Sequence, residues 1–163
     1  MADAFNLDAY RANGLPPLLW RVTHAGSQYR DDPATTDQVA SDSTRTISNK
    51  PILRRVAKDH FEWACRNPSC FLSAFRCQQH ARRWARGRRG YGEVYIHVID
   101  TAKIPDNIYV FDATSLSDKL EINYRYAANE FIFLHRIPRK CLIGRHALSA
   151  LREHGACDIV TEG

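Results

Sequence analysis

The chain has 163 residues, a length typical of one domain with a single core. Apolar residues make up 44% and charged residues 25%, which excludes a disordered polypeptide, and no apolar run reaches the ~18 residues of a transmembrane helix. The net charge of +5 favours anionic partners such as nucleotides, nucleic acids or acidic proteins, without choosing among them.

The first half of the chain is predicted to begin with a short helix over 3–13, capped by Asp3 and ended by Gly14. The segment 18–23 has the composition of a strand. The stretch 24–49 is rich in Ser, Thr, Asp and Gln, and it is too long for a plain connector. We therefore predict a long polar loop there, either functional or partly mobile.

A helix is predicted over 48–66, because Asn49 or its neighbour can cap it and Pro51 suits its first turn. Its apolar face would contain Ile52, Val56 and Trp63. The other predicted elements are strands over 70–75, 92–100, 108–112, 130–135 and 140–144, and helices over 76–89, 114–120 (capped by Thr114 or Ser115) and 146–155. Short strands mixed irregularly with helices predict an α+β fold, in one domain over 1–163 with its core at about 15–155.

The chain start, MADAFNLDAYRANG, has neither a basic n-region nor an apolar h-region. We therefore expect an intracellular protein, cytoplasmic or nuclear, without a membrane partner. Five cysteines without CxxC spacing are typical of reduced thiols. No familiar zinc module has the spacing of Cys65, Cys70, Cys77 and His80, so buried structural roles are favoured and no metal is predicted.

Three apolar strands each contain one polar residue: Arg21 in LLWRV, Ser73 in CFLSAF and Glu130 in EFIFL. Such departures from patterning concentrate at functional sites. A guanidinium binds a phosphate or diphosphate through paired hydrogen bonds, and a hydroxyl orients a ribose or the neighbouring acid. A carboxylate holds a sugar hydroxyl and stabilises an oxocarbenium ion. Together they could break an N-glycosidic bond in a nucleotide such as NAD. A structural Arg21–Glu130 ion pair, with Ser73 merely a small strand residue, is the alternative.

These residues resemble the Arg-Ser-Glu subclass of the ADP-ribosyltransferase-like superfamily, which includes heat-labile-enterotoxin-like and pierisin-like toxins and fungal relatives. The similarity lies in LLWRVTHAGS, in FLSAF followed by a helix with HARRWA, and in EFIFLHRIPRKCLIG, and it spans roughly 18–144. It implies an ADP-ribosyltransferase-like fold, with two small packed β-sheets flanked by helices. It also implies a toxin-like or effector-like enzyme that cleaves NAD, its co-substrate, and passes ADP-ribose to a protein, a nucleic acid or water.

The family pattern implies a role for each matching residue. Arg21 would anchor the phosphate and ribose of NAD, and Ser73 would shape the pocket and position the acid. Glu130 would hold the nicotinamide-ribose hydroxyl and stabilise the oxocarbenium ion as nicotinamide leaves. Backbone groups of Val22 would bind the nicotinamide amide, and Phe75 could stack beside the nicotinamide ring.

The sequence departs from the family pattern two residues before Glu130. Arginine-modifying members carry Glu there and guanine-modifying members carry Gln, whereas this chain has Ala128. Asn129, Tyr124 or Tyr126 could substitute. The middle block, Ser-Ala-Phe, also lacks a second hydroxyl that is often present after the serine. The resemblance therefore disfavours an arginine acceptor and leaves the acceptor open.

The helix predicted over 76–89 contains six arginines. Arg82, Arg83 and Arg86 could follow nucleic-acid phosphates while Trp84 stacks on a base. The alternative, which the pattern favours, is a solvated basic face with Trp84 docked inward.

Two further alternatives remain. His24, at the end of the first strand, either contacts NAD or is a loop residue without a role. The whole chain could also be a non-catalytic module that binds a nucleotide, a nucleic acid or a protein.

Overall fold

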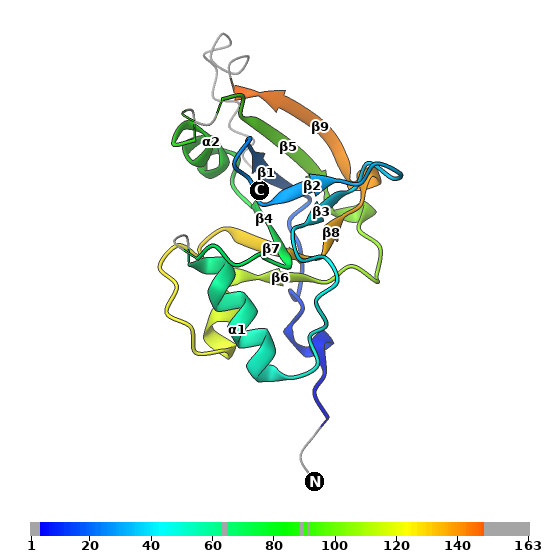
Figure 1. Cartoon of the computed structure of the whole chain (residues 1–163), viewed down its shortest axis with the longest axis vertical. Coiled ribbons are helices and arrows are strands. Elements are labelled where there is room, and N and C mark those ends of the chain that lie inside the picture. Colours follow the sequence, from blue (N-terminus) through cyan, green and yellow to red (C-terminus); the bar gives the residue numbers. More distant parts are fainter. Residues whose placement is uncertain (1–3, 63–64, 89, 91, 149–163) are drawn as a thin grey trace.

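The computed structural model describes residues 4–62, 65–88, 90 and 92–148. Six strands form one antiparallel sheet in the order β6-β7-β4-β1-β5-β9, and three form a second antiparallel sheet in the order β2-β3-β8 (Figure 1). With three α-helices among the described residues, this confirms the α+β prediction.

The large sheet contains β1 (Leu18–Thr23), β4 (Phe71–Phe75), β5 (Tyr95–Asp100), β6 (Val110–Asp112), β7 (Glu130–Leu134) and β9 (Leu142–Ala147). The small sheet contains β2 (Tyr29–Asp31), β3 (Gln38–Ala40) and β8 (Arg136–Ile137). The helices are α1 (Lys50–Phe61), α2 (Gln78–Arg86) and α3 (Ala113–Lys119), with short 3-10 turns η1 (Leu7–Tyr10), η3 (Thr101–Lys103) and η4 (Arg139–Cys141).

The large sheet consists of two well-paired halves that are joined at one residue pair. β1 pairs with β5 along its whole length, and β4 pairs with β7 along its whole length. β1 and β4, in contrast, share only the pair Trp20–Phe75. In Figure 1, β5, β9 and α2 lie in the upper part of the molecule, whereas β6, β7 and α1 lie in the lower part. The central strands therefore separate on one side of the Trp20–Phe75 pair.

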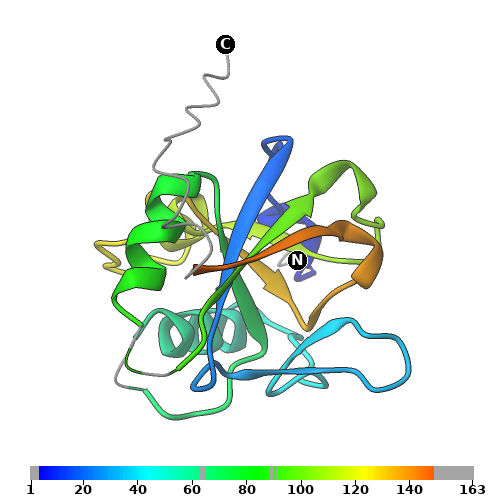
Figure 2. The same ribbon diagram turned by 90° about the horizontal axis from the view of Figure 1, so that it is seen from above.

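Different elements cover the two faces of β1. The α2 residues Ala81 and Ala85 pack in one cluster with Val22 of β1. On the other face, Leu19 packs with Ala40 of the small sheet. Figure 2 shows α2 and the β2–β3 hairpin on opposite sides of β1. The lower half of the large sheet packs mainly on α1 and α3, through a cluster rich in phenylalanine.

The structure corrects the predicted face and end of the long helix. The buried residues of α1 are Leu53, Ala57 and Phe61, not the face with Ile52 and Val56, which are half-buried. The sequence predicts a helix that continues to residue 66, whereas α1 ends at Phe61. Residue 63 of the predicted face lies outside the described residues. Its N-terminus is as predicted: the Asn49 side chain accepts a hydrogen bond from the Ile52 N–H.

Other predicted segments also differ. The predicted polar loop over 24–49 contains β2 and β3, whose three-residue lengths are too short to show a hydrophobic period. The first helix is reduced to η1 and is capped by Asn6. Asp112, not Thr114 or Ser115, caps α3. The closing helix predicted over 146–155 begins inside β9, and most of it lies outside the described residues. Within the described ranges, no helix is long and apolar enough to cross a membrane.

Candidate functional site

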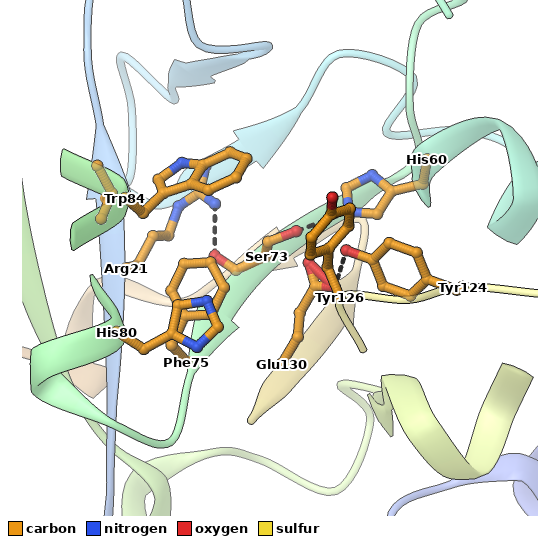
Figure 3. A pocket seen from close by; sticks show the side chains of 10 residues that line it. Arg21, His60, Ser73, Phe75, His80, Trp84, Tyr124, Tyr126 and Glu130 are labelled. Atoms are coloured by element: carbon orange, nitrogen blue, oxygen red, sulfur yellow. Dashed lines mark hydrogen bonds between the residues drawn. The ribbon is translucent and has the colours of Figure 1, made fainter. Parts of the chain in front are cut away.

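A cavity of about 190 Å³ lies where β1 and β4 separate (Figure 3). It is lined by five of the residues singled out from the sequence: Arg21 and Val22 of β1, Ser73 and Phe75 of β4, and Glu130 of β7. Five more lining residues come from α1, α2 and the segment before β7: His60, His80, Trp84, Tyr124 and Tyr126. The structure thus brings together the three polar residues that interrupt apolar strands.

Arg21 reaches this cavity because the central strands separate. Neighbouring residues of a strand point to opposite faces, so Arg21 points away from the face of Trp20 and its partner Phe75. In a continuous sheet it would lie on the opposite face from Ser73 and Glu130. Its guanidinium instead donates through Nη1 to the backbone carbonyl of Ser73, at 2.8 Å.

The Arg21 guanidinium is buried and forms no ion pair with a contacting carboxylate in the described part of the chain, although the negative charge of Asp31 in β2 acts on it from a longer distance. Its side chain is 5% exposed, Nε donates to Oε1 of Gln38 at 2.7 Å, and its Cζ lies 5.3 Å from the centre of the Tyr29 ring. Burial lowers its pKa to about 10. None of the ion pairs among the described residues includes Arg21. The Arg21–Glu130 ion pair, which was the structural alternative, is therefore absent.

Glu130 begins β7 with its carboxyl group in the same cavity. Its side chain is 6% exposed, and Oε2 accepts a hydrogen bond from the Tyr124 hydroxyl at 2.8 Å. Burial raises the pKa of Glu130 to about 7, although hydrogen bonds from Tyr124 and Ser73 oppose the shift. The cavity therefore contains a carboxyl group that changes its charge close to neutral pH.

His60 supports Ser73 from the last turn of α1, and the sequence did not single it out for this role. Its Nε2 lies 2.7 Å from Ser73 Oγ and its Nδ1 lies 2.6 Å from Ser69 Oγ. Burial, with a contribution from Arg21, lowers the pKa of His60 to about 4. The neutral ring has one donor and one acceptor. With the proton on Nε2, the ring donates a hydrogen bond to Ser73 Oγ. The Ser73 hydroxyl can then donate its own hydrogen bond to the Glu130 carboxyl group.

Replacing His60 by alanine is expected to lower the free energy of unfolding by about 2–4 kcal/mol, because two buried hydrogen bonds and a ring are lost, and to lower about tenfold any catalytic rate that depends on Ser73. If His60 acts through Ser73, the double variant with Ser73→Ala loses no more activity than Ser73→Ala alone. The exposed His146→Ala is the matched control. Losses of activity that add in the double variant would contradict the link.

Aromatic side chains flank the polar centre on two sides. Phe75 stacks on the His80 ring at 4.7 Å between centroids, and Trp84 lies 6.1 Å from Phe75. On the other side, Tyr124 stacks on Phe61 at 4.2 Å, and Tyr126 meets Tyr124 edge to face. Figure 3 shows the two groups on either side of Ser73 and Glu130. The space between them suits a planar ring.

A second cavity of about 250 Å³ adjoins the first and shares Arg21, Val22 and Ser73 with it. His24 and Arg88 line this second cavity, so His24 lies beside the predicted site rather than in the first cavity. Burial lowers the pKa of His24, and the positive charges of Arg88 and Arg21 contribute. The joined space extends from Glu130 past Arg21 to Arg88, and the acidic Asp59 and Glu62 also line its second part.

The side chains of the basic helix α2 differ in burial. Trp84 is half-buried and lines both cavities. Arg83 and Arg86 are exposed, whereas Nε of Arg82 is buried and has no hydrogen-bond partner. Across the described ranges, no group of three or more His, Cys, Asp or Glu side chains is placed to hold a metal ion. The described cysteines are free thiols.

Comparison with known proteins identifies the family but not the activity. No curated protein matches the chain. Residues 14–151 match DUF7587, a domain of unknown function. This match covers most of the chain, including Arg21, Ser73 and Glu130 and both cavities. The protein therefore belongs to the DUF7587 family.

Proposed function

We propose that this protein has an ADP-ribosyltransferase-like fold and cleaves the nicotinamide–ribose bond of NAD, passing ADP-ribose to a macromolecule or to water. One observation supports this most strongly. A buried guanidinium and a buried carboxyl group line one cavity without neutralising each other. Unpaired buried charges are costly to stability, so their persistence favours a functional role.

The two cavities suit the two halves of a dinucleotide. Arg21 lies at their junction and has more N–H donors than its hydrogen bonds to Gln38 and Ser73 use. The remaining donors would bind the diphosphate. Val22 lies beyond the single β1–β4 pair, so the backbone there has no strand partner on the β4 side and can bind the nicotinamide amide. With its amide bound in this way, the nicotinamide ring would pack against Phe75.

In the proposed reaction, the Glu130 carboxylate accepts a hydrogen bond from the nicotinamide-ribose hydroxyl. The bond between the ribose carbon and the nicotinamide nitrogen breaks, and nicotinamide leaves with the electron pair. The ribose becomes an oxocarbenium ion, which Glu130 stabilises strongly because this residue is buried and water screens its charge little. A nucleophile of the acceptor, or water, then bonds to that carbon and releases its proton to the solvent.

The residues around the cavity also support a proposal about the chemical class of the ADP-ribose acceptor. Ala128 is exposed and has no group that could orient a guanidinium, so we disfavour an arginine side chain as acceptor. Tyr126 is 57% exposed at the edge of the cavity, and Arg83 and Arg86 add positive charge on α2. These features are compatible with a protein or a nucleic acid as acceptor, with water as the default.

Nicotinamide release is expected to rise with pH and to level off above about pH 8. The reason is that only ionised Glu130 stabilises the oxocarbenium ion, and burial raises its pKa to about 7. The measurement is kcat/KM for NAD between pH 5.5 and 9, by chromatography of released nicotinamide. A protein that neither binds NAD nor releases nicotinamide would instead be a non-catalytic binding module.

A further inference from the structure

Arg21 is the first member of a chain of buried polar side chains behind the cavity. Arg21, Thr23, Gln38 and His97 are each no more than 8% exposed. Arg21 lies directly opposite His97 in the β1–β5 register, and β3 of the small sheet contributes Gln38. Oε1 of Gln38 accepts from Arg21, Nε2 of Gln38 lies 3.3 Å from Nδ1 of His97, and Nε2 of His97 lies 2.8 Å from Oγ1 of Thr23.

The chemistry of Arg21 fixes the direction of every hydrogen bond in this chain. A guanidinium can only donate, so the Gln38 oxygen must face Arg21 and the Gln38 amide group must face His97. The amide group also only donates, so Nδ1 of His97 must accept. The imidazole is then neutral with its proton on Nε2, which donates to Thr23. Burial favours this neutral form, because it lowers the pKa of His97 to about 4.

Gln38 therefore holds Arg21 without neutralising it. A carboxylate is the usual partner of a buried guanidinium, and it would cancel the positive charge within the fold. A neutral amide satisfies the Nε–H group, fixes the plane of the guanidinium and leaves the charge for a ligand in the cavity. His97 in turn prevents the Gln38 amide group from rotating by half a turn, because Nδ1 of His97 can only accept a hydrogen bond.

We propose that Gln38, held by His97, is a positioning residue that orients Arg21 and keeps its guanidinium free of an ion pair, so that it can bind the phosphates of the ligand. The identification of that ligand as NAD rests on the proposed function above. The orientation of Arg21 and its affinity for a diphosphate do not depend on catalysis.

The test compares Gln38→Glu with the wild type. A carboxylate at this position pairs with Arg21, so binding of inorganic pyrophosphate at pH 7.5, measured by calorimetry, is expected to weaken at least tenfold. In turnover, KM for NAD should rise more than kcat falls, because Arg21 binds the diphosphate equally in the ground and transition states. Gln79→Glu makes the same charge change at an exposed position of α2 and should leave binding unchanged.

A spectroscopic signature separates positioning from general damage to the fold. In the wild type, ¹⁵N NMR should show His97 neutral with Nδ1 unprotonated. In Gln38→Glu the new carboxylate oxygen needs a donor, so Nδ1 of His97 should become protonated. If Gln38→Glu does not fold, His97→Asn and His97→Leu provide the same comparison. Asparagine can still accept from Gln38 and should retain pyrophosphate binding, whereas leucine should weaken it several-fold.

The outcomes separate this inference from the proposed function. Unchanged pyrophosphate binding in a folded Gln38→Glu, or equal binding by the two His97 variants, overturns the positioning role even if NAD is cleaved. If the Gln38 and His97 variants behave as expected but the wild type releases no nicotinamide, the positioning role stands and the proposed enzymatic function fails.

Discussion

A Glu130→Gln variant is expected to lose nicotinamide release by about 10²–10³-fold and yet to be more stable than the wild type above pH 7. The loss of activity follows from removing the charge that stabilises the oxocarbenium ion. Glutamine keeps the shape of the side chain and can still accept a hydrogen bond from Tyr124. Unchanged nicotinamide release in the folded variant would eliminate Glu130 as the catalytic carboxylate.

The gain in stability follows from proton linkage. Burial raises the pKa of folded Glu130 to about 7, compared with about 4.3 in an unfolded chain. Below pH ~4 the carboxyl group is protonated in both states and costs nothing. Between pH ~4 and 7 the unfolded chain loses this proton while the folded state keeps it, so the wild type loses stability on the order of 3 kcal/mol, and above pH 7 the folded state holds a buried carboxylate. Glutamine never ionises and avoids this cost.

Urea unfolding at pH 5, 7 and 8.5 measures this effect. The difference in unfolding free energy between Glu130→Gln and the wild type should be small at pH 5 and should grow toward about 3 kcal/mol at pH 8.5. Glu121→Gln, at an exposed position, is the matched control and should show no such growth. A Glu130→Gln variant that is less stable at every pH would indicate a structural carboxylate.

The sequence predicted the strands of the site better than the contacts between its residues. β1 matched its predicted bounds because LLWRVT is a compact apolar run, and the polar residue inside each strand marked Arg21, Ser73 and Glu130. Alternation within β1 could not show that Arg21 reaches Ser73. That contact depends on the separation of β1 and β4 beyond one pair, which is a property of the whole sheet.

The residues that support the site were missed for physical reasons. His60 was not singled out because the apolar face of its helix was assigned one residue out of phase, and its contact with Ser73 depends on where α1 ends. Gln38 lies in a three-residue strand inside a polar stretch, which has no hydrophobic period. Nothing in the alternating pattern of its strand distinguishes His97 from an ordinary half-buried residue, whereas it is 8% exposed and hydrogen-bonded on both nitrogens.

An Arg21→Met variant is expected to bind NAD at least 10²-fold more weakly while its stability changes little. The loss of affinity reflects the charge-assisted hydrogen bonds to the diphosphate, which are worth about 3 kcal/mol or more when desolvated. Arg21→Lys should bind almost as weakly, because one ammonium group cannot serve Gln38, Ser73 and a phosphate at once.

The small change in stability is what distinguishes a ligand-binding arginine from a structural one. Burial lowers the pKa of Arg21 from 12.5 to about 10, so keeping it charged at pH 7 costs on the order of 3 kcal/mol, a cost that methionine removes. Methionine also leaves Oε1 of Gln38 and the Ser73 carbonyl without their donor, at about 1–3 kcal/mol each. The two effects nearly cancel.

Breaking a structural buried ion pair would instead cost about 3–5 kcal/mol without any compensation. Calorimetry with NAD and with pyrophosphate, together with urea unfolding at pH 7, measures both quantities on one sample. Arg86→Met, at an exposed position of α2, is the matched control. Wild-type affinity in Arg21→Met would show that the guanidinium does not bind the ligand. A large loss of stability with little loss of affinity would return Arg21 to a structural role, because its charge would then serve the fold rather than a ligand.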